Sequence, residues 1–67
     1  MLKFTESELK SLLNVLNMAV LDAEGIKSAS QTGDNYNEGM YAGWLVYDLE
    51  LAYGIMTKVK ERSQGNA

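Results

Sequence analysis

Asp48 is the side chain of this sequence best placed to do chemistry, because it is an acid inside an apolar helical stripe. On a helical wheel of about 100° per residue it lies among Tyr41, Trp44 and Leu45. A carboxylate there is unfavourable unless it is paired or hydrogen-bonded. It can contact a ligand or a protein partner, or it can bond to a tyrosine hydroxyl, the Trp44 indole or a lysine of a neighbouring chain. A position in water at the edge of the stripe is the remaining interpretation.

Catalytic and metal-binding constellations are missing from the sequence. It contains no His and no Cys, which removes the commonest general base near neutral pH and the commonest metal ligands. Glu6 and Glu8 are explained by helix capping, and residues 31–34 lack the strand and the lysine of a phosphate-binding loop. We therefore expect no enzymatic activity, no metal site and no cofactor.

Aromatic residues gather in the second half of the chain and offer the largest potential binding surface. They are Tyr36, Tyr41, Trp44, Tyr47 and Tyr53. Tyrosine and tryptophan are enriched at binding hot spots, but they also pack in cores and dimer interfaces or stack on small ligands.

Gly39, Gly43 and Gly54 share one side of the same predicted helix. Glycine in a helix interior is less favourable than alanine by about 1 kcal/mol. Close packing of another helix would offset this loss. A notch for a ligand is a second interpretation, and no special role is a third.

Two amphipathic helices position these residues. Thr5 and Glu8 have the spacing of a capping box, and Gly25 is typical of a helix end, so the first helix is predicted over about 5–24. Its apolar residues recur at intervals of three and four, and Asp22 falls on the polar side. The predicted core stripe consists of Leu9, Leu12, Leu13, Leu16, Ala19, Val20 and Ala23.

The second helix is predicted over about 35–62, after a polar connection over about 25–34. A short extension of the first helix through Ile26, Lys27 and Ala29 is an alternative for the start of this connection. The second helix is expected to start at Asp34 or Asn35, and Asn35 with Glu38 repeats the capping-box spacing. The stripe expected to face the first helix consists of Tyr41, Leu45, Leu49, Ala52, Ile55, Met56 and Val59. Residues 1–67 thus form one helical domain, an antiparallel hairpin.

An excess of apolar surface predicts association. A core this small is marginal, and oligomerisation is the remaining source of stability without disulfides or metals. We expect an all-α hairpin that dimerises into a four-helix bundle, with a frayed tail over 63–67. The surface expected to meet the second copy or another partner consists of Met18, Leu21, Met40, Trp44, Tyr47 and Leu51. Asp48 and Tyr41 are the candidates for a buried polar contact.

Composition narrows the class of partner. A net charge of −3 and a pI of about 4.6 disfavour nucleic acid. The longest apolar run falls far short of the ~20 residues of a membrane span, and the N-terminal segment lacks the apolar region of a secretory signal. The absence of Cys suits a reducing compartment. We expect a cytoplasmic protein that contacts neither membrane nor nucleic acid.

The chain resembles the small helical-hairpin proteins common in bacteriophages and other mobile elements. The likeness rests on residues 2–13, LKFTESELKSLL, which open straight into the first helix, and on the Gly/Asp/Asn loop and second amphipathic helix that follow. It covers the whole chain and carries over no functional residue. It implies a cytosolic, often dimeric protein that binds a host protein, in some cases against host defence. The aromatic second helix departs from the Glu/Lys-rich one usual in that group.

The resulting expectation is a protein-binding inhibitor or modulator that occludes a surface of a host protein as a dimer. A protein that sequesters a nucleotide-like ligand between its helices is one alternative. The basic residues count against it, because all lie near helix ends, in the loop or on polar faces. A structural or assembly subunit is the other alternative.

Overall fold

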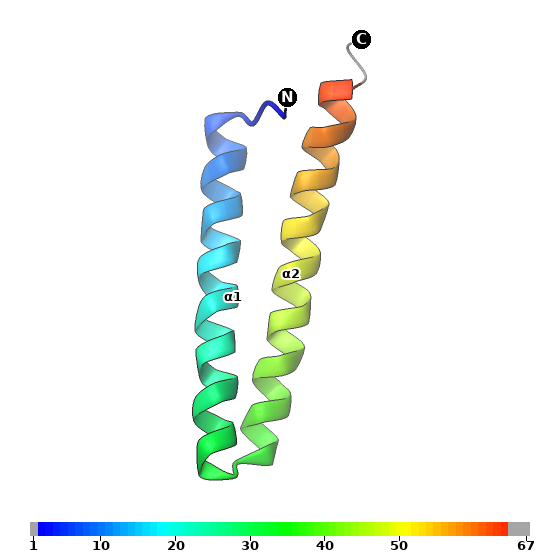
Figure 1. Cartoon of the computed structure of the whole chain (residues 1–67). Coiled ribbons are helices and arrows are strands. Elements are labelled where there is room, and N and C mark those ends of the chain that lie inside the picture. Colours follow the sequence, from blue (N-terminus) through cyan, green and yellow to red (C-terminus); the bar gives the residue numbers. More distant parts are fainter. Residues whose placement is uncertain (1, 65–67) are drawn as a thin grey trace.

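The chain forms an antiparallel hairpin of two long helices in a computed structural model that describes residues 2–64 (Figure 1). Helix α1 spans Glu6–Thr32 and helix α2 spans Asn35–Gln64. The prediction of an all-α, two-helix hairpin is confirmed. Residues 63 and 64, predicted to fray, belong to α2, and the rest of that predicted tail lies outside the described residues.

Helix α1 begins at the predicted capping box. Thr5 Oγ1 accepts a hydrogen bond from the Glu8 amide at 3.1 Å, and Glu8 Oε1 accepts one from the Thr5 amide at 2.8 Å. These reciprocal bonds satisfy amide groups that the start of a helix leaves free. The sequence therefore located the first helix start correctly.

Helix α1 does not end at Gly25. It continues to Thr32, so the predictions of a helix over 5–24 and a connection over 25–34 are wrong, and the alternative of a helical extension through Ile26, Lys27 and Ala29 is confirmed. A Cβ atom at Gly25 would lie 2.8 Å from ring atoms of Tyr41. Gly25 thus gives the Tyr41 ring room to pack against α1, and glycine serves here as a contact rather than as a helix stop.

The turn between the helices consists of Gly33 and Asp34. Gly33 has φ 73°, the left-handed conformation that glycine adopts readily, and the Asp34 amide donates to the Ala29 carbonyl at 2.9 Å. Asp34 Oδ1 then accepts from the Asn37 amide at 3.1 Å. Asp34 therefore caps α2 and Asn35 is its first residue, so Asp34 is the cap among the two predicted starts, Asp34 and Asn35.

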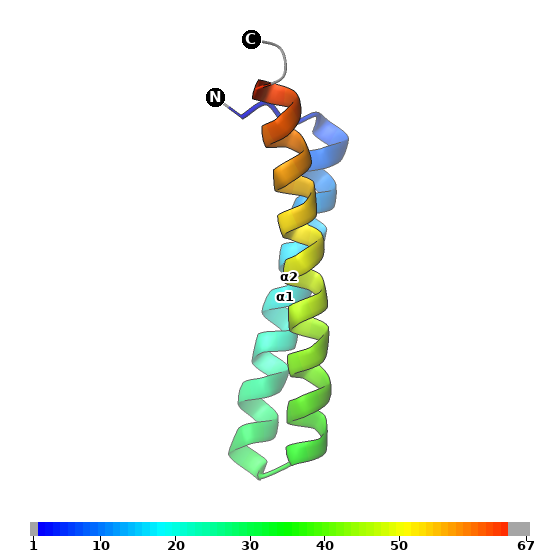
Figure 2. The ribbon, with the colours of Figure 1, turned by 90° about the vertical axis from the view of Figure 1, so that its right-hand side faces the viewer.

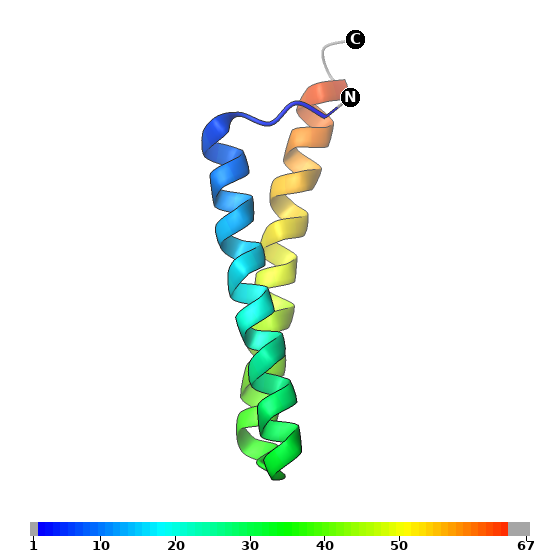
Figure 3. The same ribbon diagram turned by 60° about the vertical axis from the view of Figure 1, so that its left-hand side comes forward.

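The helices meet along a seam with the three–four spacing of a coiled coil, and Figures 2 and 3 show them crossing at a shallow angle. The seam residues of α1, all buried or half-buried, are Glu8, Leu12, Val15, Ala19, Asp22, Ile26 and Ala29. Those of α2 are Tyr41, Leu45, Asp48, Ala52, Ile55 and Val59, also buried or half-buried, followed by the more exposed Arg62.

An ion pair closes the open end of the hairpin. Arg62 contacts both carboxylate oxygens of Glu8, at 2.6 Å and 2.8 Å, and also donates to the Lys3 carbonyl. The Lys3 amide donates to Ser63 Oγ at 3.2 Å. The Arg62 hydrogen bonds, followed by the bond from the Thr5 amide, lower the pKa of Glu8 to about 2. Glu8 therefore serves the helix cap and the helix pair together.

The buried apolar core of the hairpin is small. Its members are Leu12, Ala19, Ala29, Ala52 and Val59, of which only Val59 is completely covered. Alanines contribute little apolar area, so the hairpin leaves most of its large apolar side chains in contact with water. No helix within residues 2–64 combines the length and apolarity that a membrane crossing needs.

The predicted core stripe of α1 is wrong for all its large residues except Leu12, whereas that of α2 is wrong only at Leu49 and Met56. The predicted core residues that the structure leaves exposed are Leu9, Leu13, Leu16, Val20, Ala23, Leu49 and Met56. Helix α1 carries two adjacent apolar stripes, and only one of them continues to the turn, through Ile26 and Ala29. The other ends at Ala23 because Lys27 and Ser30 follow it. The hairpin uses the stripe that can follow α2 along its whole length.

Candidate functional site

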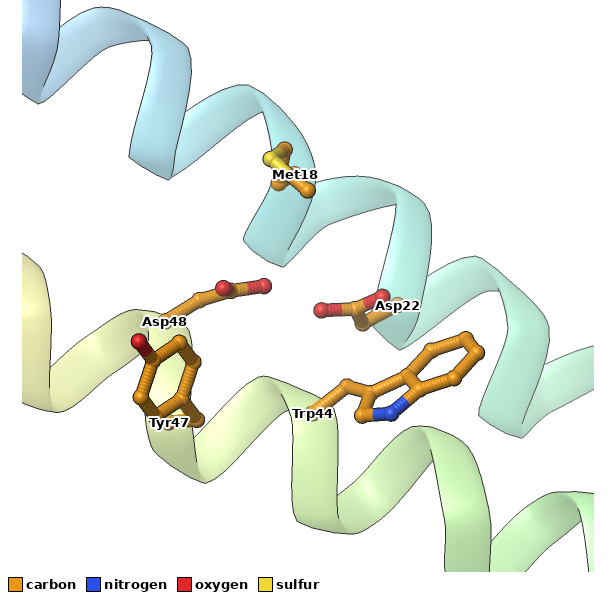
Figure 4. Close-up of a pocket in the computed structure, with 5 residues that line it drawn as sticks. All are labelled: Met18, Asp22, Trp44, Tyr47 and Asp48. Carbon is orange, nitrogen blue, oxygen red and sulfur yellow. The ribbon is translucent and has the colours of Figure 1, made fainter.

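Two aspartates face each other in the middle of the seam. Asp22 of α1 is 8% exposed and Asp48 of α2 is 6% exposed, and Figure 4 shows their carboxylates pointing toward one another. Asp22 Oδ2 is buried and has no hydrogen-bond partner among the described residues. Buried acids are unfavourable unless a proton or a cation is shared between them. This layer is therefore the least satisfied part of the hairpin.

The coiled-coil register explains why the aspartates meet. Asp22 lies two heptads after Glu8, and Asp48 lies two heptads before Arg62. The antiparallel register that pairs Glu8 with Arg62 therefore also pairs Asp22 with Asp48. The prediction that Asp22 lies on the polar side is wrong. The signal for its burial was its place in the seven-residue repeat with Leu12, Val15, Ala19, Ile26 and Ala29.

Proximity raises the pKa of Asp22 above its ordinary value of 3.8. The largest cause is a hydrogen bond to Asp48, in which protonated Asp22 is the donor. Burial and the negative charge of Asp48 act in the same direction. Asp22 therefore retains a proton more readily than an exposed aspartate does.

A pocket of about 300 Å³ opens over the acid pair. Met18 and Asp22 line it from α1, and Trp44, Tyr47 and Asp48 line it from α2 (Figure 4). Apolar and aromatic walls thus surround two carboxyl groups. An acidic floor disfavours phosphates and other anions and favours a cation that carries an apolar stem.

Tyr41 supports the aromatic wall of the pocket by packing against Trp44. The Trp44 and Tyr41 rings meet edge to face, with centroids 5.4 Å apart and an interplanar angle of 87°. This geometry is the favoured one for aromatic pairs. Tyr41 in turn occupies the space that a side chain at Gly25 would fill. The structure thus gives Tyr41 a packing role, and it places Asp22, rather than a tyrosine hydroxyl, opposite Asp48.

The predicted partner-binding residues lie together on the pocket side of the seam, which we call the aromatic face. It consists of Met18, Leu21, Met40, Trp44, Tyr47 and Leu51. Met40 is half-buried and the other five are exposed. Serine, asparagine and lysine side chains border this patch along the helices, so its apolar centre is confined to the surroundings of the pocket.

The opposite side of the seam carries a second apolar surface, which we call the aliphatic face. It consists of Leu9, Leu13, Leu16, Val20 and Ala23 of α1 and Ala42, Val46, Leu49, Tyr53 and Met56 of α2, all exposed. These residues follow directly on seam residues or lie one helical turn from them, on the same side in both antiparallel helices. Apart from the Tyr53 hydroxyl, no charged or polar group interrupts the face between its end residues. This face was not predicted, because seven of its ten residues were assigned to the core stripes.

The three glycines of α2 do not provide close packing within the hairpin. An added Cβ at Gly39, Gly43 or Gly54 would meet no atom of the described chain within 4 Å. The closely packed glycine is Gly25, which the sequence had suggested as a helix end.

Neither the search for metal ligands nor the comparisons with known proteins indicates a function. Within residues 2–64, no group of three or more Asp, Glu, His or Cys side chains is placed to hold a metal ion. Comparisons with protein-family models, with curated proteins and with solved structures found no match. We therefore infer function from the two faces and from the acid pair between the helices.

Proposed function

We propose that this chain is a protein-binding modulator that works as a homodimer. The aliphatic face packs against a second copy to form a four-helix bundle, and the aromatic face binds a different protein and occludes its surface. The observation that supports this proposal best is the uninterrupted aliphatic face, which a monomer would leave in water.

A second copy is the occupant that best suits the aliphatic face. The hairpin's own buried core is rich in alanine, so it gains little stability from burial and needs further apolar contacts. A flat strip of aliphatic residues over two antiparallel helices is self-complementary about a twofold axis. An obligate dimer of this kind has no stable folded monomer.

The aromatic face suits a different partner, because its apolar residues form a compact patch around an acidic centre rather than a long strip. Exposed tryptophan and tyrosine side chains at the centre of such a patch are typical of binding hot spots. Trp44 is 50% exposed and Tyr47 is 62% exposed. The resemblance to bacteriophage hairpin proteins suggests a host-cell protein as this partner. The acid pair argues against the nucleotide-sequestering alternative, since it repels phosphates.

A matched pair of substitutions tests the assignment of the faces. Leu13 and Leu21 lie on the same helix with nearly equal exposure, 58% and 57%, but on opposite faces. We expect Leu13→Glu to raise the dimer dissociation constant by roughly a hundredfold or more, because it buries an unpaired charge in the bundle. Leu21→Glu should leave the dimer intact. Light scattering of the purified proteins measures both.

Each outcome of this experiment is informative. Wild-type protein should have twice the chain mass of 7.4 kDa at low micromolar concentration. A stable, folded monomer would contradict the proposal. If Leu21→Glu dissociated the dimer and Leu13→Glu did not, the aromatic face would be the dimer interface. Loss of a captured host protein by dimeric Leu21→Glu would place that partner on the aromatic face.

A further inference from the structure

The acid pair is an incomplete polar site. Asp22 and Asp48 are both more than nine-tenths buried, and Asp22 Oδ2 has no partner among the described residues. One shared proton supplies a single hydrogen bond for the four carboxyl oxygens, so the two acids still lack donors. Both side chains line the same pocket (Figure 4). A ligand that brings several hydrogen-bond donors and a positive charge would complete the site.

We propose that the pocket over Asp22 and Asp48 binds a guanidinium group on an apolar stem. Neither the dimer nor the protein partner proposed above is needed for this site, because all five lining residues belong to one hairpin. The guanidinium comes either from a free guanidine compound or from an arginine side chain of a bound protein.

The donor pattern favours guanidinium over ammonium. Guanidinium is planar and carries five N–H donors in a fixed fork, so it can bridge two carboxylates, whereas ammonium is a compact point charge. The terminal torsion of an aspartate is soft, so small rotations can adapt both carboxylates to the guanidinium fork. The incoming cation takes the place of the shared proton, which leaves to solvent.

The pocket walls favour the same ligand. Guanidinium stacks on aromatic rings, and Trp44 and Tyr47 stand beside the acid pair. Met18 offers a flexible, polarisable contact to the apolar stem from α1. A volume of about 300 Å³ lies at the lower end of ligand pockets and fits a small guanidine rather than a large ligand.

Three probes of the same stem length test the site on the full chain. Butylguanidine should shift Trp44 fluorescence saturably, with a dissociation constant of about 1 mM for so small a ligand. Butylamine carries the charge without the planar fork, and butylurea carries the planar shape without the charge. We expect both to bind at least about tenfold more weakly. Equal binding of either compound would overturn the guanidinium assignment.

Variants locate the site. Asp22→Asn and Asp48→Asn keep the shape of the side chain, relieve repulsion between the acids and should fold, as circular dichroism can verify. We expect each to weaken butylguanidine binding about tenfold or more, because a charge-assisted bond is lost. Glu24→Gln removes an exposed acid of α1 and should leave binding unchanged. An equal loss with Glu24→Gln would show nonspecific charge attraction and would refute the site.

A capped tripeptide with a central arginine distinguishes the two sources of the guanidinium. Binding tighter than that of butylguanidine, and abolished by Asp48→Asn, would identify an arginine of a protein chain. Weaker binding of the tripeptide, with butylguanidine still bound, would identify a free guanidine compound. If neither compound bound at millimolar concentration, the proposal would be wrong, while the light-scattering test of the dimer would be unaffected.

Discussion

Two layers of the hairpin seam each contain an acid from α1, but only one of these acids is paired with a positive charge. At the open end, Glu8 meets Arg62, and both charges are satisfied by short hydrogen bonds. Two heptads further along, Asp22 meets Asp48, and one carboxyl oxygen remains unpartnered. The Glu8 and Arg62 side chains are 22% and 41% exposed, whereas the aspartates are almost fully covered.

The charges of the first layer stabilise the fold, whereas those of the second layer are available for binding. The Glu8–Arg62 layer closes the ends of the helices and is complete within the chain. The Asp22–Asp48 layer opposes folding, because it places two acids where the seam would otherwise bury apolar residues. Real proteins tolerate such local violations mainly at functional sites, which is why we assign binding to the central layer.

Replacing the two charged residues of each layer with leucines should give the largest difference in stability between the two layers. Asp22→Leu with Asp48→Leu extends the apolar seam through the pocket, so we expect the thermal midpoint to rise by about 5 °C or more. Glu8→Leu with Arg62→Leu should lower it slightly, because the capping and cross-helix bonds are lost without much burial in return. Thermal melts followed by circular dichroism measure both. Equal shifts of the same sign would refute the proposed contrast.

The two layers should also respond oppositely to pH. The Asp22 pKa is raised in the folded state, so its contribution to stability is full below the ordinary value of 3.8 and is lost as pH rises through the folded pKa. The Glu8 pKa is lowered to about 2, so its contribution is full above the ordinary value of 4.5 and is lost as pH falls toward 2. Melts across this range should therefore show greatest stability on the acid side of neutrality.

Single substitutions test which residue causes the loss of stability at each end of this pH profile. Asp22→Asn should flatten the fall in stability toward neutral pH, and Arg62→Gln should flatten the fall toward strong acid. Glu24→Gln, which changes an exposed acid, serves as the control. A profile for Asp22→Asn that matched wild type would show that the acid pair does not control the neutral limb.

The smallest expected effect concerns the wall behind the pocket. Gly43→Ala meets no described atom and should stabilise α2 by about 1 kcal/mol through helix propensity alone. Gly25→Ala would place its Cβ 2.8 Å from the Tyr41 ring. It should therefore destabilise the hairpin by ~1–2 kcal/mol despite the same gain in propensity. Chemical denaturation measures both variants, and Trp44 fluorescence should respond only to Gly25→Ala. Stabilisation by both alanines would contradict the contact.

The sequence predicted local features of the fold better than the pairing of the helices. Thr5 and Glu8 identify a helix start from neighbouring residues alone, and the structure confirms it. Gly25 could not be interpreted locally, because its role depends on Tyr41, which lies far along the chain. The absence of a helix break at Gly25 and the short turn at Gly33 together set the register.

The candidate site could be predicted only in part for the same reason. Asp48 stood out because its neighbours on the helical wheel are apolar. Asp22 did not, because two apolar stripes of α1 adjoin and the larger leucines favour the wrong one. Only the alternation of three and four through Ala29, seen together with its counterpart in α2, places Asp22 in the seam. The pocket is a property of the pair and not of either helix.

The two-residue turn at Gly33 and Asp34 determines which residues of the two helices face each other. Exchange of outward-facing residues leaves the Glu8–Arg62 and Asp22–Asp48 layers in register. Insertion or deletion of one residue in the helical segments between Asp22 and Asp48 rotates everything beyond it by about 100° and separates the two aspartates. Related chains can therefore differ in their outward-facing residues but not in the number of residues between the two aspartates. Conserved spacing between the two aspartates, more than similarity of the sequence around them, would mark such related chains.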